Sequence, residues 1–170
     1  MQTQPSIEVV QAEGAAALDA VRGLFREYAD SLGVDLAFQG FEAELAALPA
    51  DYAPPGGVLL LALVDGQPAG CGALRPLPDA DYANACEMKR LYVRPAFRRF
   101  GLGRQMAQVL IDHAMQAGYS SLLLDTLDEM EAARGLYLSL GFEEIPPYYF
   151  NPIAGAHYLK ADLGSTATHW

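Results

Sequence analysis

The chain has 170 residues, of which 52% are hydrophobic and 19% charged, and its formal net charge is −10. The apolar fraction excludes a disordered chain, because it is large enough for a packed core. The length suits one domain, so we predict a single domain over residues 1–170. The excess of negative charge argues against a nucleic-acid partner.

Neither an export signal nor a membrane span is expected. The longest aliphatic run, at residues 58–64, is far too short to cross a bilayer, and the N-terminus lacks a cationic stretch followed by an apolar core. The two cysteines, Cys71 and Cys86, are too few for a disulfide scaffold and lack metal-ligand spacing. We therefore expect a cytoplasmic protein without membrane contact or bound metal, with buried, reduced thiols.

The first half of the chain predicts a strand, two helices and a hairpin. Apolar residues three or four apart indicate the helices, and short aliphatic runs indicate the strands. Asp65 and Gly66 form the turn signal of the hairpin, and Gly70 and Gly72 in its second strand weaken that strand or let another backbone come close. The predicted elements are a strand at 7–10, helices at 18–32 and 41–48, and strands at 58–64 and from 67 to about 75.

The second half predicts alternating strands and helices. A proline after Arg94 ends one strand, while Gly118 and Gly141 end helices. The predicted elements are a loop at 76–84, a strand at 86–93, a helix at 102–117, a strand at 121–126, a helix at 130–140 and two strands within 142–163. The order indicates a mixed α/β fold.

Positive charge is concentrated in one segment. Six of the 11 basic residues fall within residues 89–104, which contain no acidic residue. On an acidic protein, such a segment predicts a confined anion site; the alternative is a solvated basic face. The six are Lys89, Arg90, Arg94, Arg98, Arg99 and Arg104.

The same segment has the order strand, short loop, glycines, helix. Gly101 and Gly103 allow a ligand to approach the backbone, and the first helical turn offers unpaired N–H groups and the positive end of the dipole. With three arginines nearby, the arrangement suits a diphosphate. The alternative is a glycine-rich helix entry without a ligand.

Two motifs resemble those of the GNAT acyltransferase superfamily. Arg98-x-x-Gly101-x-Gly103 is similar to its pyrophosphate-binding signature, Q/R-x-x-G-x-G/A. Residues 133–142 are similar to its A-x-x-L-Y-x-x-x-G-F block. The resemblance covers nearly the whole chain and implies a GNAT fold, an α/β architecture with a mixed, mainly antiparallel sheet flanked by helices.

The resemblance also implies site residues. The strand at 87–93 should separate from the strand at 121–126, and its backbone should bind the pantetheine arm of acetyl-CoA. Tyr137 is the implied general acid for the departing thiolate, and Glu87 the implied base, with Asp125 and Asp81 in reserve. Cofactor contacts are expected from Leu91, Tyr92, Val93, Arg98, Arg99, Phe100, Gly101, Leu102, Gly103 and Arg104.

Alternative readings stay open for several residues. Tyr137 also fits an apolar core stripe, and Glu87 could be a solvent-facing carboxylate. Two residues depart from the family pattern: Met130 stands where asparagine is common, and Phe100 where a small or basic residue is usual.

The expected reaction is acetyl transfer from acetyl-CoA to a primary amine. Because no cysteine or serine has a recognisable nucleophile setting, transfer should be direct. A noncatalytic acyl-CoA-binding module, a longer acyl donor and a homodimer are also compatible with the sequence. The acceptor itself carries no readable motif, although Tyr148, Tyr149 and Phe150 are candidates to line its pocket.

Overall fold

The computed structural model describes residues 4–32, 40–78, 80–127, 131–149 and 155–163. Within them the chain forms one seven-stranded sheet with the order β1-β2-β3-β4-β5-β7-β6. The strands are β1 (Ile7–Gln11), β2 (Val58–Val64), β3 (Gln67–Pro76), β4 (Ala85–Val93), β5 (Ser121–Leu127), β6 (Glu143–Ile145) and β7 (Ala156–Asp162). The helices are α1 (Ala15–Leu32), α2 (Phe41–Ala47), α3 (Leu102–Gln116) and α4 (Glu131–Ser139), with short 3-10 turns η2 (Ala50–Tyr52) and η3 (Pro95–Phe100).

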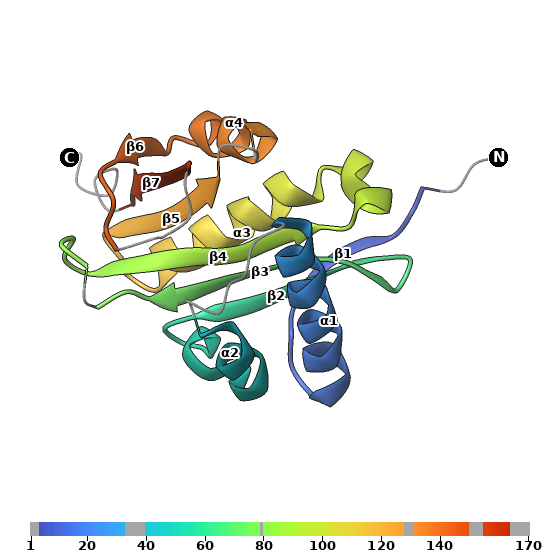
Figure 1. Cartoon of the computed structure of the whole chain (residues 1–170). Coiled ribbons are helices and arrows are strands. Elements are labelled where there is room, and N and C mark those ends of the chain that lie inside the picture. Colours follow the sequence, from blue (N-terminus) through green and yellow to red (C-terminus); the bar gives the residue numbers. More distant parts are fainter. Residues whose placement is uncertain (1–3, 33–39, 79, 128–130, 150–154, 164–170) are drawn as a thin grey trace.

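The sheet is antiparallel except at its centre. β4 and β5 are parallel, while every other neighbouring pair runs antiparallel. Parallel neighbours need a crossover, and α3 provides it between these two strands. The predicted mixed, mainly antiparallel sheet flanked by helices is confirmed (Figure 1).

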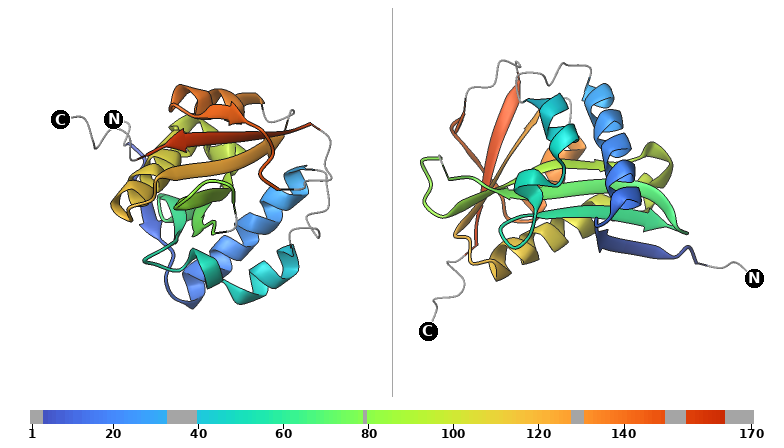
Figure 2. Two further views of the ribbon diagram at one scale, coloured as in Figure 1. Left: turned by 90° about the vertical axis from the view of Figure 1, so that its left-hand side faces the viewer. Right: turned by 90° about the horizontal axis from the view of Figure 1, so that it is seen from below.

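Helices cover both faces of the sheet and bury an apolar core on each. α3 packs on one face through fully buried residues such as Met106 and Leu110. α1 and α2 pack on the other through Leu24, Phe25 and Leu45, as the view from below in Figure 2 shows. No helix in the described ranges is long and apolar enough to cross a membrane.

The predicted elements are found, with changes at their ends. α2 stops at Ala47 because Leu48 precedes a proline and takes an extended conformation (ψ 137°). Gly101 alone caps α3, so Gly103 lies inside that helix and does not open it. The short 3-10 turns were not predicted, and Met130, expected in the last helix, lies outside the described residues.

The parallel pairing at the centre of the sheet is short. β4 and β5 pair at only three positions, from Ala85 with Ser121 to Glu87 with Leu123. Both strands continue beyond this point without pairing to each other, and Figure 1 shows them diverging toward the start of α3. The predicted separation of these strands is therefore present in the fold.

A β-bulge in β4 lies within this unpaired stretch. Between the pairs Cys71 with Tyr92 and Ala73 with Lys89, the single residue Gly72 lies opposite two residues of β4. The first of these, Arg90, has a φ of 62°, which an L-residue adopts at a cost. The bulge shifts the alternation of side chains, so consecutive residues can face the same side of the sheet.

Gly70 permits the close approach of β3 and β4, as its position in the strand predicted. A Cβ at this residue would lie 2.7 Å from the Tyr92 carbonyl oxygen and 3.0 Å from the Met106 methyl group. We expect Gly70→Ala to lower the free energy of unfolding by about 1–3 kcal/mol, as overpacked sites do. Urea denaturation measures this change.

Gly23→Ala is the matched control. Gly23 lies within α1, and a Cβ there meets nothing within 4 Å. The substitution should stabilise the protein by about 0.5–1 kcal/mol through helix propensity. Equal effects at the two glycines would contradict the close approach at Gly70.

Candidate active site

A cavity of about 450 Å³ opens where β4 leaves β5. Its walls are the last turn of α1, the end of β4, the first turn of α4 and the side chain of Arg98. Tyr28 contributes from α1 and contacts the Tyr92 ring edge-on, with 6.1 Å between ring centroids. The unpaired end of β4 thus borders a ligand-sized space that Arg98, in the turn before α3, also lines.

The backbone of β4 faces this cavity at alternate residues. The Arg94 N–H donates to the Ala69 carbonyl of β3 at 2.8 Å, so the backbone groups of Leu91 and Val93 point to the opposite side, toward the separation from β5. Arg98 confirms this direction, because its Nε donates to the Val93 carbonyl at 2.9 Å. Tyr92 turns its backbone to β3 but its side chain lines the cavity.

The start of α3, residues 101–104, has the backbone geometry expected of an anion cradle, and we call it the cradle. Gly101, in the left-handed region with a φ of 71°, caps the helix, and the Gln105 N–H makes a backbone bond to the Gly101 carbonyl at 3.2 Å. The amides of residues 102–104 precede this bond and lack partners within the helix. A Cβ on Gly103 would meet only Leu136, at an ordinary 3.8 Å, so packing does not require glycine there.

The basic segment is divided between two sites, which corrects the expectation that all six cations form one anion site. Lys89, Arg90 and Arg94 lie next to the carboxylates of Glu87, Glu44 and Glu27 at 4.0, 3.0 and 2.6 Å. The bulge and the ladder direct these three side chains toward the α1 and α2 face.

Arg98, Arg99 and Arg104 remain exposed near the cradle. They bond to the Val93 carbonyl, the Ala96 carbonyl and the Ser139 hydroxyl. No carboxylate in the described part of the chain forms an ion pair with them. Their charges are therefore available to a diphosphate.

Two other residues that were predicted to contact the cofactor, Leu102 and Phe100, pack against the rest of the protein. Leu102 is fully buried, so only its backbone can meet a ligand at the cradle. Phe100 packs at 6.4 Å from Phe97 between ring centroids, and the Arg99 guanidinium lies 4.6 Å from the centre of its ring.

Tyr137 lies on α4 in the core beside Phe142, with 5.7 Å between ring centroids. Burial raises the pKa of its hydroxyl, and the nearby Tyr28 and Asp125 raise it further. The phenol is therefore protonated at neutral pH. Of these two residues, Tyr28 lines the cavity and Asp125 lies on β5.

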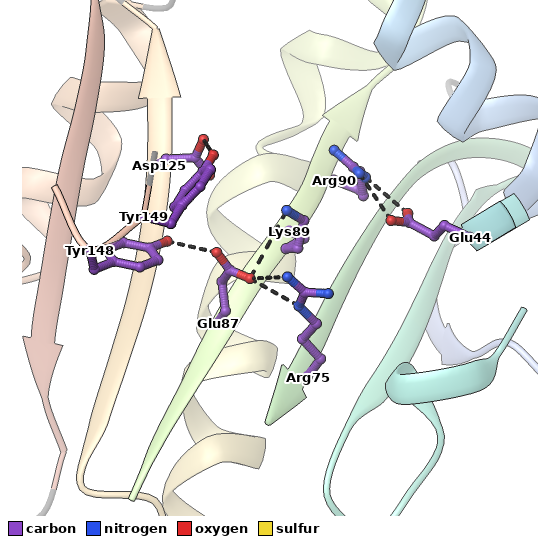
Figure 3. A network of polar contacts seen from close by, with 8 residues as sticks. All are labelled: Glu44, Arg75, Glu87, Lys89, Arg90, Asp125, Tyr148 and Tyr149. Atoms are coloured by element: carbon purple, nitrogen blue, oxygen red, sulfur yellow. Dashed lines mark hydrogen bonds and ion pairs between the residues drawn. The ribbon is translucent and has the colours of Figure 1, made fainter. Parts of the chain in front are cut away.

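Glu87 is almost fully buried, so its reading as a solvent-facing carboxylate is wrong. Its Oε1 accepts from Arg75 Nε at 2.9 Å, and its Oε2 accepts from the Tyr148 hydroxyl at 2.7 Å. Lys89 lies on the same side of β4, and burial lowers the pKa of its ammonium group. Figure 3 shows these side chains converging on Glu87.

The reserve carboxylates have different positions. Asp125 on β5 accepts a hydrogen bond of 2.5 Å from the Tyr149 hydroxyl, whereas Asp81 is exposed. The aromatic pair predicted to line the acceptor pocket thus binds one carboxylate on each diverging strand. Phe150 lies outside the described residues.

Comparison with known proteins identifies the family. The acetyltransferase (GNAT) family model matches residues 21–142. The chain belongs to the GNAT acetyltransferase family. An uncharacterized N-acetyltransferase of Schizosaccharomyces pombe is 41% identical over 86% of this chain and 88% of its own length. The GNAT chain is therefore an acyltransferase.

Solved structures confirm the GNAT fold. A GNAT-family acetyltransferase of Staphylococcus aureus superposes with a TM-score of 0.76 at 18% identity, over 93% of this chain and 99% of that one. A putative acetyltransferase of Salmonella typhimurium, solved with its cofactor acetyl-CoA, gives 0.73 at 21% identity, over 94% and 95%.

The thiols of this GNAT protein are unsuited to covalent catalysis. Cys71 and Cys86 are free and buried, as predicted. Burial raises the pKa of both, that of Cys86 to about 12, so neither is a thiolate at neutral pH. This agrees with direct transfer.

The ion pair between Glu27 of α1 and Arg94, which follows β4, gives a pH-dependent prediction. Arg94 lowers the pKa of Glu27 from its ordinary 4.5, mainly through their hydrogen bonds. Because the pKa of Glu27 is lower in the folded than in the unfolded protein, the pair stabilises the fold at pH values above the ordinary pKa. This stabilisation is lost as the pH falls through the lowered pKa. Glu27→Gln should therefore lower the free energy of unfolding at pH 7, by up to about 1 kcal/mol because both side chains are partly exposed.

Urea denaturation of wild type and variant across pH 3–8 checks this expectation, and the difference should shrink below about pH 4.5. Glu42→Gln is the control, because Glu42 is 75% exposed and its oxygen lies 3.4 Å from Arg26. A Glu27→Gln effect that grew on acidification would contradict the assignment.

Proposed function

We propose that this GNAT protein transfers an acetyl group from acetyl-CoA directly to a primary amine. The observation that carries the proposal is a cavity lined by the unpaired end of β4 and by Arg98, a residue of the short turn that leads to the first amides of α3. A long thioester with a diphosphate at one end fits such a path. The residues present therefore suit the cosubstrate.

Each part of the path has a proposed role. Leu91 and Val93 would hold the pantetheine arm through their outward backbone groups, and the amides of residues 102–104 with Arg98 and Arg104 would bind the diphosphate. A backbone N–H of β4 would stabilise the negative charge that develops on the acyl oxygen, an effect worth about 3 kcal/mol in other enzymes.

Two side chains would move protons. The amine nitrogen attacks the acyl carbon and the carbon–sulfur bond breaks, so the sulfur gains a proton and the nitrogen loses one. Tyr137, which is protonated, would give its proton to the sulfur. Glu87 would receive the proton of the amine, directly or through a water molecule, with Arg75 and Tyr148 holding its carboxylate.

Gly103→Val tests the cradle. The side chain should fill the space before the first amides of α3 and weaken CoA binding at least about tenfold, because several hydrogen bonds to the diphosphate are lost. Stability should change by less than about 0.5 kcal/mol, since glycine and valine have similar helix propensities. Titration calorimetry with CoA and urea denaturation measure the two effects.

Gly135→Val is the matched control within α4, where a Cβ meets nothing within 4 Å. It should leave CoA affinity unchanged. If Gly103→Val bound CoA as tightly as this control does, the cradle would not be the diphosphate site.

Tyr137→Phe tests the proposed acid. Turnover should fall about 100-fold, the usual contribution of a general acid, while CoA affinity stays within about twofold. Stopped-flow or steady-state detection of the released thiol gives the turnover, and calorimetry gives the affinity. Wild-type turnover in this variant would remove Tyr137 from the mechanism.

A further inference from the structure

The end of α4 lies against the start of α3, at the cradle. The Nη2 of Arg104 donates a hydrogen bond to the Ser139 hydroxyl at 2.7 Å. One residue earlier, a Cβ on Gly103 would lie 3.8 Å from the side chain of Leu136. Leu136 and Ser139 are three residues apart and therefore share a face of α4. Two adjacent positions of the cradle thus contact one face of this helix.

The Ser139 hydroxyl connects Arg104 to the backbone of α4. Its oxygen accepts from Arg104, while the hydroxyl donates to the Leu136 carbonyl at 2.6 Å. Because the single hydroxyl proton is used within the helix, the oxygen presents a lone pair to the guanidinium. The same carbonyl accepts from the Leu140 N–H at 3.1 Å, so the chain of hydrogen bonds ends in the last turn of α4. Arg104 is therefore attached to the helix itself.

The charge of Arg104 is left for another group. Arg104 lies in the first turn of α3, where the helix dipole disfavours a cation, and its partner is a neutral hydroxyl. Among the residues that the structure describes, its side chain has no other hydrogen bond and no ion pair. A guanidinium carries several N–H groups in a planar fork, so one edge can hold Ser139 while the other binds an anion.

The placement of α4 determines where the proposed acid lies. Tyr137 stands two residues before Ser139, in a helix of nine residues. A helix this short is marginal without outside contacts, so its position depends on the groups that hold it. In its first half, Arg134 lies 2.8 Å from the His157 ring nitrogen of β7, and at its end Ser139 bonds to Arg104. The second of these contacts leads to the cradle.

We propose that Ser139 is a positioning residue that couples binding of the diphosphate to the placement of Tyr137. The inference rests on the proposed acetyl transfer and adds a residue to it. A diphosphate on the unused edge of Arg104 holds the guanidinium, which holds the end of α4 through the hydroxyl. Binding of a remote part of the cosubstrate then places the acid at the thioester, so a donor without that part loses turnover as well as affinity.

Hydrogen exchange of the α4 amides tests the coupling without an acceptor. In the wild type, saturating CoA should slow exchange in the last turn of α4 at least about threefold, because a helix end that is held opens less often. Saturating pantetheine, which lacks the diphosphate, should not. In Ser139→Ala, the affinity for CoA in calorimetry should stay within about fivefold of wild type, but this protection should be absent. Equal protection in the two proteins, or none in either, would overturn the inference.

Turnover gives the second readout. The acceptor is the amine that releases thiol fastest in a panel of L-amino acids, polyamines and short peptides. The kcat for acetyl-CoA should fall at least about threefold in Ser139→Ala, whereas the kcat for S-acetylpantetheine should stay the same. A substitution that only disturbs the structure lowers both values alike, and that outcome would contradict the coupling. Ser139→Thr keeps the hydroxyl and should restore the wild-type ratio of the two values.

Leu138→Ala is the matched control. Leu138 is the neighbouring residue of α4, and it is 51% exposed. Its loss should change neither the protection by CoA nor the ratio of the two kcat values. Ser139→Ala should remain folded, because alanine has the higher helix propensity, and urea denaturation checks this. Failure of the proposed function has a different signature: CoA would not bind in calorimetry, and neither donor would release thiol.

Discussion

The early end of the β4–β5 ladder is the constraint on which the rest of the site depends. A continuous parallel ladder would have satisfied the backbone of β4 and closed the sheet. Because pairing stops at Glu87 and Leu123, β5 does not use the outward backbone groups of Leu91 and Val93, and the cavity extends along them to Arg98.

Basic residues that are close in sequence have different roles in this site. Arg90 and Arg94 bind glutamates of α2 and α1, which ties both helices to the strand that carries the proposed chemistry. Arg98 and Arg104 stay exposed at the cradle. Internal pairs of this kind contribute more to a defined position of the helices than to net stability. One short segment thus forms part of the cavity wall and leads into the cradle.

The elements and the glycine-capped start of α3 were predictable from the sequence because both rest on local patterns. Helical and strand periodicities are local, and so is the run from Arg98 to Gly103, which needs only a glycine-capped helix start to become an anion site. The division of the basic segment was not predictable, since it depends on the bulge at Arg90. Nothing near Arg90 signals a positive φ, because the extra residue is defined only by pairing with β3.

The partners of Glu87 were missed for a similar reason. Arg75 lies 12 residues before it and Tyr148 61 residues after it, so no spacing rule connects them. Tyr148 and Tyr149 were recognised as candidates from their composition alone. Their attachment to carboxylates on two different strands depends on the order β4-β5-β7-β6, which sequence patterns do not specify.

Because of the bulge, the length of β4 is more tightly constrained than the identity of its residues. Removing one residue between Glu87 and Val93 would restore regular alternation and turn each side chain on one side of the deletion to the other face of the sheet. Arg90 would lose Glu44, and the groups that face the cavity would change places with those that face α1. Relatives should therefore vary in composition along this strand while insertions and deletions gather in the loops around it.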